Sequence, residues 1–375
     1  MMRYSWLFLW ALVLLSATLQ GQLPSSAKVD AASSVSVPDF PYSQGWLGAD
    51  DAYSIPISPN RSLWLFGDTF VGTPKTQLRN QSKTMVRNSV GISDCRPGHA
   101  CTIRYFWNKP NDPKPRSFFD TGTDDLWYWP LDADLSGDTL YVSLLAVRNK
   151  PGSTSKDAFG FEIAGTKLAT ISNAHDSPPK WRIRVTDLSD SRLWLGVSIV
   201  PEHNELIWYT QVSEGEGHGF MTAVRVARDK VGELPNAWEH LNQNGQWVSG
   251  LPGSDAAHVI DQAISEMSVR YHPSIKKWIA LSTGPEFPSP RAVIREADSP
   301  IGPWSKPQTI FEIPEMKSAN PGYDKDTFCY AVKEHVEFAD DKIVLTYACN
   351  SMVLKKTMDN MLIYRPKVVV LDLPK

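Results

Sequence analysis

The sequence has no block of lysine and arginine, no long apolar run beyond its first residues, and only four cysteines among 375 residues. Lys and Arg number 38 against 41 Asp and Glu, so the formal net charge is −3 and neither nucleic acid nor an anionic membrane is an expected partner. HExxH, a glycine-rich phosphate loop and a serine nucleophile elbow are all missing. We therefore predict neither a catalytic metal nor a cofactor, and leave open whether an axial channel holds Ca²⁺.

The one apolar run near the N-terminus is typical of a secretory signal. Arg3 supplies a positive charge, and Trp6–Ala17 form an apolar segment that is too short to span a membrane comfortably. No clear cleavage motif follows. We predict a signal peptide at residues 1–21, a flexible Ser/Ala-rich leader at 22–39, and a secreted or periplasmic protein without a stable membrane anchor.

The four cysteines form two pairs by position. Cys95 and Cys101 enclose a short loop, whereas Cys329 and Cys349 flank a predicted hairpin. Neither pair has the CxxC spacing of a metal site, so two disulfides and an oxidising compartment are expected.

Five strand-like phrases recur along the chain at nearly constant spacing. The successive intervals between Trp64, Tyr141, Trp208, Trp278 and Val344 are 77, 67, 70 and 66 residues. Helical signals are sparse, with Ala256–Ser265 the best candidate for a short helix. A long period of strand-rich units predicts an all-β, five-bladed β-propeller over residues 40–375. We expect a monomer whose segment Lys367–Leu371 completes the ring by pairing with the first blade.

Carboxylates recur on the predicted inner strands, which converge on the propeller axis. Four of the five inner strands carry acids, and the third, Arg192–Val197, has none. The acids are Asp50 and Asp51 in the first repeat, Asp132 in the second, Glu266 in the fourth and Glu334, beside His335, in the fifth. Paired carboxylates are what glycoside cleavage requires, one as acid and one as base or nucleophile.

Adjacent residues on a strand point to opposite faces, so only one of Asp50 and Asp51 is expected to face the axis, and Asp51 is weakly favoured. Asp68 is interpreted as a turn residue. The candidates for binding sugar hydroxyls or rings are Asp50, Arg87, Asn88, Trp129, Arg270, Glu334 and His335, with Trp46 and Trp127 as further stacking platforms at the rim. The simpler alternatives are an ion pair for Arg270, a structural histidine for His335, and core packing for most of the 14 Trp.

These motifs together resemble the DUF4185-type proteins, secreted five-bladed propellers similar to furanosidase-like glycoside hydrolases. The matching segments are Gly48–Asp51, Leu63–Phe70, Val86–Ser89, Trp129–Asp132, Ser268–Tyr271, Ser299–Ser305, Lys333–His335 and Leu345–Asn350. The resemblance implies that Asp51 or Asp50 is base or nucleophile and that Asp132 tunes the pKa values of the site. The general acid in the related enzymes comes from the third blade, which lacks one here, so Glu266 takes its place.

Two functions follow from the sequence. The first is a glycosidase that acts on a polysaccharide or oligosaccharide such as arabinan, with Asp51, Asp132 and Glu266 as its catalytic residues. The second is a propeller that binds carbohydrate or another surface without catalysis.

Overall fold

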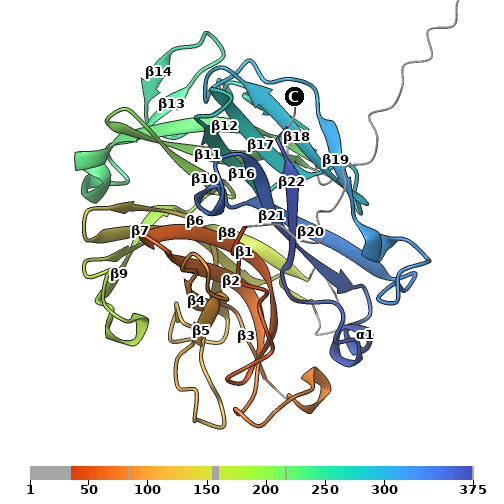
Figure 1. The fold of residues 1–375 in the computed structure, drawn as a ribbon. Helices are drawn as coiled ribbons and strands as arrows, with labels where there is room; N and C mark the ends of the chain where they lie inside the picture. Colours follow the sequence, from red (N-terminus) through yellow and green to blue (C-terminus); the bar gives the residue numbers. More distant parts are fainter. Residues whose placement is uncertain (1–34, 83, 154–159, 216–217, 263, 374–375) are drawn as a thin grey trace, which may run out of the picture.

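The computed structural model describes residues 35–373 apart from 83, 154–159, 216–217 and 263, and the predicted signal peptide at 1–21 lies outside them. In the described part of the chain, five antiparallel sheets surround a common axis (Figure 1). Their innermost strands contact one another in the order β1, β6, β10, β16, β20, and β20 contacts β1 again. The predicted all-β, five-bladed propeller is confirmed.

The first three blades contain most of the strands. Blade 1 comprises β1 (Trp46–Ser58), β2 (Arg61–Val71), β3 (Thr84–Val86), β4 (Ser89–Asp94) and β5 (Thr102–Phe106). Blade 2 comprises β6 (Leu126–Ser136), β7 (Thr139–Asn149), β8 (Phe161–Ile171) and β9 (Ile183–Ser189). Blade 3 comprises β10 (Trp194–Glu202), β11 (Glu205–Gly215), β12 (His218–Ala227), β13 (Glu239–Leu241), β14 (Trp247–Ser249) and β15 (Ile260–Asp261).

The last two blades are smaller. Blade 4 comprises β16 (Met267–His272), β17 (Lys277–Thr283), β18 (Arg291–Ala297) and β19 (Gln308–Glu312). Blade 5 comprises β20 (Thr327–Glu334), β21 (Lys342–Ser351) and β22 (Lys367–Asp372), with the short helix α1 (Leu354–Asp359) between its last two strands. Short 3₁₀ segments lie at Arg79–Gln81, Pro178–Lys180, Arg228–Glu233, Pro314–Met316 and Val336–Phe338.

The repeating phrases of the sequence are the second strands of the blades. Their centres Trp64, Tyr141, Trp208, Trp278 and Val344 lie in β2, β7, β11, β17 and β21. These strands read as nearly continuous apolar runs because both faces of each sheet are covered by a neighbouring blade. The hydrophobic core is accordingly divided into clusters that join residues of adjacent blades.

Two predictions about local structure are wrong. Ala256–Ser265 forms no helix in its described residues; instead Ile260 and Asp261 pair with β12, whose edge satisfies their backbone groups. Lys367–Leu371 does not pair with blade 1 but lies in β22, which pairs with β21 over Ile343↔Leu371 to Thr346↔Val368. β22 thereby gives blade 5 a third strand, without which it would be a marginal two-stranded hairpin.

Side chains, rather than a shared sheet, close the ring between blades 5 and 1. The buried guanidinium group of Arg79 donates hydrogen bonds to Leu47 O (3.0 Å), Ile363 O (2.8 Å) and Asn360 O (3.2 Å), and also to Thr357 O. Ser54 of β1 bonds to His335 of blade 5, with 2.7 Å between Oγ and Nδ1. The two ends of the propeller are therefore held together by buried polar contacts.

Both predicted disulfides are present. Cys95 bonds to Cys101 in the β4–β5 loop, and Cys329 of β20 bonds to Cys349 at the directly opposite position of β21. Two disulfides fit a protein that folds in an oxidising, extracellular environment. None of the helices in the described residues is long and apolar enough to cross a membrane.

Candidate active site

Asp50 and Asp51 both approach the same point of the neighbouring strand. The register of β1 against β2 shifts on both sides of Asp51, and Asp51 and Ala52 have positive φ angles of 63° and 96°. A Cβ atom placed on Gly67 of β2 would lie 2.5 Å from Asp50 Oδ1 and 2.7 Å from Asp51 Oδ2. The expectation that only one of the two faces the axis is therefore wrong, because a β-bulge breaks the alternation of side chains.

Asp50 is held by phenol groups rather than by a cation. Tyr330 donates a hydrogen bond to Asp50 Oδ2 at 2.7 Å, and Tyr364 does so at 3.4 Å. Asp50 Oδ1 is buried and has no hydrogen-bond partner among the described residues. Burial, followed by the charges of Asp51 and Asp68, raises the pKa of Asp50 well above its usual range.

Asp51 and Glu266 come from different blades and interact electrostatically. Glu266 immediately precedes β16 and is half-buried. Burial raises the pKa of Asp51 to about 6, although Lys333 opposes this effect. Burial and the charge of Asp51 raise the pKa of Glu266 to about 7, against the opposing effects of Lys333 and the backbone N–H of Ala331.

Asp132 lies deeper, with a side chain that is only 1% exposed. Arg270 of β16 donates hydrogen bonds to both of its oxygens, at 3.0 and 3.3 Å. Ser198 Oγ and the backbone N–H of Ile199, both on β10, donate to Asp132 Oδ2 at 3.2 and 2.9 Å. The third blade, which has no inner acid, thus supplies donors to the acid of the second blade.

Asp68 belongs to this group of acids, although the sequence suggested a turn residue. Arg87 forms an ion pair with Asp68 Oδ2 at 3.0 Å, and the indole N–H of Trp129 donates to Asp68 Oδ1 at 2.9 Å. Its pKa is raised, chiefly by burial. The side chains of Arg87 and Trp129 are half-buried, so this corner of the site is accessible to solvent.

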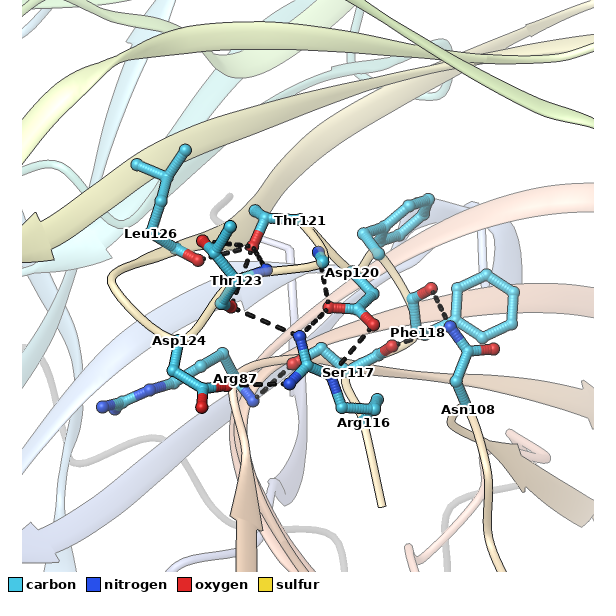
Figure 2. A network of polar contacts seen from close by, with 12 residues as sticks. Arg87, Asn108, Arg116, Ser117, Phe118, Asp120, Thr121, Thr123, Asp124 and Leu126 are labelled. Atoms are coloured by element: carbon cyan, nitrogen blue, oxygen red, sulfur yellow. Dashed lines mark hydrogen bonds and ion pairs between the residues drawn. The ribbon is translucent and has the colours of Figure 1, made fainter. Parts of the chain in front are cut away.

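The β5–β6 connection holds the backbone of Arg87 (Figure 2). The backbone N–H of Arg87 donates to Ser117 Oγ at 2.9 Å, while Arg116 donates to both oxygens of Asp120 at 3.0 and 2.9 Å. Arg116 also pairs with Asp124 at 2.7 Å. These contacts fix the loop that precedes the inner strand of blade 2.

Several predicted binding residues are structural instead. Asn88 is fully buried, and its amide bonds to Phe119 O, Tyr128 O and Phe119 N–H, which leaves it unsuited to bind a sugar hydroxyl. Trp46 is fully buried and stacks on Tyr105 with 4.3 Å between ring centroids, so it lies in the core and not at the rim. Trp127 is also buried, with the Arg87 guanidinium group 4.3 Å from its ring centroid.

Glu334 and His335 point toward the interior but have almost no exposed surface. Glu334 Oε1 lies 2.7 Å from Nε2 of His272. His335 lies between Ser54 Oγ and Thr346 Oγ1, at 2.7 and 2.8 Å, and burial lowers its pKa well below the usual range, so the ring is neutral. These contacts join the inner strands of blades 1, 4 and 5 in the interior, so the prediction that Glu334 and His335 bind sugar at the surface of the site is wrong.

Lys333 and Tyr53 are members of the site that sequence reasoning missed. The Lys333 ammonium group lies 4.0 Å from the ring centroid of Tyr53, and both side chains are buried. Lys333 could have been suspected because it directly precedes Glu334, a predicted site residue. On a regular strand, however, neighbouring side chains point to opposite faces, so the pattern gave no reason to expect Lys333 to point toward the axis.

Two further observations bear on ligands. Among the described residues, no group of three or more His, Cys, Asp or Glu side chains is arranged to hold a metal ion. A cavity of about 680 Å³ lies away from the acids, at the far end of β1, and is lined by the β1–β2 turn, Cys95, Pro97 and the β20–β21 connection.

Solved structures place the chain among proteins of the same fold. A candidate hydrolase from Bacteroides ovatus ATCC 8483 is 19% identical, with a TM-score of 0.70 over 88% of this chain and 86% of that protein. An α-L-arabinofuranosidase from Lactobacillus brevis (TM-score 0.46, 10% identity, 88% and 92% covered) and a GH43_1 enzyme from Xanthomonas citri (0.45, 10%, 88% and 88%) are more distant. TM-scores this low support no conclusion about function.

No curated protein matches the chain. One family profile matches residues 40–371, and it is not that of the DUF4185-type proteins that the motifs resembled. The profile covers nearly all of the propeller, from the residues that precede β1 to the last strand. The chain belongs to the family described as Domain of unknown function (DUF5005).

Proposed function

We propose that this protein is a secreted glycoside hydrolase that acts on an oligosaccharide or polysaccharide. The observation that carries the proposal is that Asp51 and Glu266, two carboxyl groups from different blades, lie close enough for the charge of Asp51 to raise the pKa of Glu266, and have pKa values of about 6 and 7. Glycoside cleavage needs one carboxylate and one protonated carboxyl group on either side of the scissile bond. The candidate hydrolase of Bacteroides ovatus, which shares the fold, agrees with this class of reaction.

The roles of the two acids follow from their surroundings. Asp51, with the lower pKa and Lys333 as a nearby cation, is the base or nucleophile. Glu266, with the higher pKa, is the general acid. Asp50 has no cation beside it in the described part of the chain and a strongly raised pKa, so it suits hydrogen bonding to a sugar hydroxyl better than it suits the role of base.

Other residues would position the substrate. Asp132 orients Arg270 and stabilises the junction of three blades from below, without an exposed surface of its own. Trp129, fixed by its bond to Asp68, offers a half-buried ring on which a sugar can stack. Carboxylates can accept hydrogen bonds from sugar hydroxyl groups and the indole can pack on a sugar ring, as the proposed carbohydrate substrate requires.

The test is a screen of arabinan, xylan and galactan together with p-nitrophenyl glycosides, using wild type, Glu266→Gln and Asp51→Asn. We expect both variants to lose on the order of 10²–10⁴ in kcat on the polysaccharide, the usual contribution of general acid–base catalysis. The loss in Glu266→Gln should be much smaller on a p-nitrophenyl glycoside, whose leaving group needs little protonation. Unchanged turnover in Glu266→Gln would remove Glu266 from the mechanism.

The pH profile gives a second readout of the same proposal. Asp51 must be ionised and Glu266 protonated, so kcat/KM should follow a narrow bell with limbs near pH 6 and 7. An optimum far outside this interval would contradict the assigned roles.

A non-catalytic carbohydrate-binding propeller is the second candidate. It is favoured by the inner strand of blade 3, where Ser198 donates a hydrogen bond to Asp132 of blade 2 but the strand supplies no acid of its own at this position. Affinity electrophoresis in gels that contain each polysaccharide distinguishes the two, because a binding protein is retarded without releasing reducing ends.

A further inference from the structure

Lys333 is a buried cation whose ammonium group has no hydrogen-bond partner among the described residues. The side chain is 1% exposed and ranks among the largest that are fully buried. Its Nζ atom lies 4.0 Å from the ring centroid of Tyr53. An ammonium group is strongly hydrated in water, so its burial is costly unless nearby charges compensate it.

The backbone of β20 turns this side chain toward the axis. The register of β20 against β21 shifts between Tyr330 and Lys333, and Ala331 has a φ angle of 55°. The same irregularity brings the backbone N–H of Ala331 to Glu266 and the Tyr330 hydroxyl to Asp50. One bulge in blade 5 therefore supplies a donor or a charge to three carboxyl groups of other elements.

The acids around Lys333 come from three other inner elements of the propeller. Burial lowers the pKa of Lys333, the negative charges of Asp51 on β1, Glu266 before β16 and Asp132 on β6 act against this effect in that order, and Arg270 on β16 adds to it. His335, which directly follows β20, is neutral. Asp132 is already paired with Arg270 through both oxygens. Of the acids that the structure describes, Asp51 and Glu266 are therefore the two that have no other cation beside them and whose pKa values Lys333 lowers.

We propose that Lys333 is a positioning residue whose ammonium group is the shared counter-ion of Asp51 and Glu266. It allows the two carboxyl groups to hold one proton between them, so that one is ionised while the other stays protonated. The catalytic consequence rests on the proposed function, but the charge sharing itself does not.

The direct test is a carboxyl titration by ¹³C NMR in protein labelled at Asp and Glu, with resonances assigned by Asp51→Asn and Glu266→Gln. In Lys333→Met the titration midpoints of both acids should rise by about one to two pH units, because a nearby cation lowers a carboxyl pKa by this order. The matched control is Lys367→Met, in which a lysine of the same blade, 23% exposed and 3.7 Å from Glu315, is removed. Midpoints in Lys333→Met that equal those of the control would overturn the proposal.

Activity provides the second arm, on whichever substrate the screen identifies. The bell of kcat/KM should move to higher pH in Lys333→Met, and kcat/KM at pH 5.5 should fall about tenfold for every pH unit by which the acidic limb moves. A hydrolase whose profile is the same in Lys333→Met and Lys367→Met contradicts the inference. If the titration midpoints shift but the protein hydrolyses none of the substrates, Lys333 is confirmed as the counter-ion and the proposed glycosidase function is rejected.

Lys333→Met alone could fail to fold, because it leaves two buried acids without their cation. Lys333→Met/Asp51→Asn removes one charge of each sign, so the stability to urea that Asp51→Asn adds should be larger in the Lys333→Met background than in the wild-type background. An equal gain in the two backgrounds would show that the two charges are not coupled, and would also overturn the proposal.

Discussion

At the scale of single residues, the site brings several carboxyl groups together in a largely buried environment. Asp50, Asp51, Asp68 and Glu266 all have raised pKa values, and burial is the largest cause for each. For Asp50, Asp51 and Glu266 the repulsion of a neighbouring acid adds to burial. The site therefore retains protons near neutral pH that isolated carboxyl groups would have lost.

The raised pKa of Asp51 makes the stability of the fold depend on pH. Asp51 binds its proton more tightly in the folded protein, with a pKa of about 6, than in the unfolded chain, so its contribution is greatest at low pH and is lost as pH rises through 6. The free energy of unfolding of Asp51→Asn minus that of wild type should therefore increase by on the order of 2 kcal/mol as the pH rises from 4 to 7. Urea denaturation at pH 4, 5, 6 and 7 measures the difference.

Asp298→Asn is the control for that series. Its carboxylate is 85% exposed and pairs with Lys277 at the surface, so the difference from wild type should stay within about 0.5 kcal/mol at every pH. A pH-independent difference for Asp51→Asn would contradict the raised pKa.

At the scale of elements, two bulges build the site. One in β1 brings Asp50 and Asp51 to the same side, and one in β20 turns Lys333 inward. Opposite the first bulge, β2 carries Gly67, whose missing side chain leaves room for both carboxyl groups. The acids are placed by irregular backbone held between regular strands.

Gly67→Ala tests this placement. The added Cβ would lie 2.5 and 2.7 Å from oxygens of Asp50 and Asp51, so the two carboxyl groups must move aside. A displacement of about 1 Å can cost on the order of 10² in kcat/KM. We expect that loss with less than about 1.5 kcal/mol change in the free energy of unfolding, since side-chain ends and not backbone are displaced.

Gly232→Ala is the matched control, because a Cβ there meets no atom within 4 Å. It should leave both kcat/KM and stability close to wild type. Full activity in Gly67→Ala would show that the crowding around Gly67 does not fix the reacting acids.

At the scale of the whole molecule, the ring is closed by buried side chains between blades 5 and 1. β22 completes blade 5 alone, so no strand is shared across the junction. Arg79 instead connects the loop after β2 to the carbonyl groups around α1. Because Asp50 and Tyr330 face each other across the same junction, the site depends on this closure.

Arg79→Met should open the junction. It leaves several buried carbonyl groups without a donor, which we expect to cost about 3 kcal/mol or more. Hydrogen–deuterium exchange should accelerate in β1 and in β20–β22 and change little in β7 and β8 of blade 2.

Arg116→Met serves for comparison, since Arg116 also donates several hydrogen bonds, all of them inside one loop. Its exchange should change in the β5–β6 connection alone. Uniform acceleration over all five blades in Arg79→Met would show that Arg79 stabilises the ring as a whole rather than this junction.

Much of the architecture could be predicted because it depends on local pattern. Trp64, Tyr141, Trp208, Trp278 and Val344 mark the second strands, since a strand covered on both faces must be apolar throughout. The cysteine pairing followed from hairpin geometry in the same way. The β15 strand was missed because its pairing partner, β12, lies about forty residues earlier in the chain.

The number of blades, the disulfides and the recurrence of acids on or directly beside the inner strands could be predicted from the sequence alone, because each depends on spacing and periodicity along the chain. Which of these side chains meet depends on the tertiary fold. A bulge reverses the direction of a side chain without changing the residues around it, and its position is settled by packing against the next blade. Asp68 and Lys333 thus lie with Asp51 and Glu266, while Asn88, Glu334 and His335 are buried structural residues.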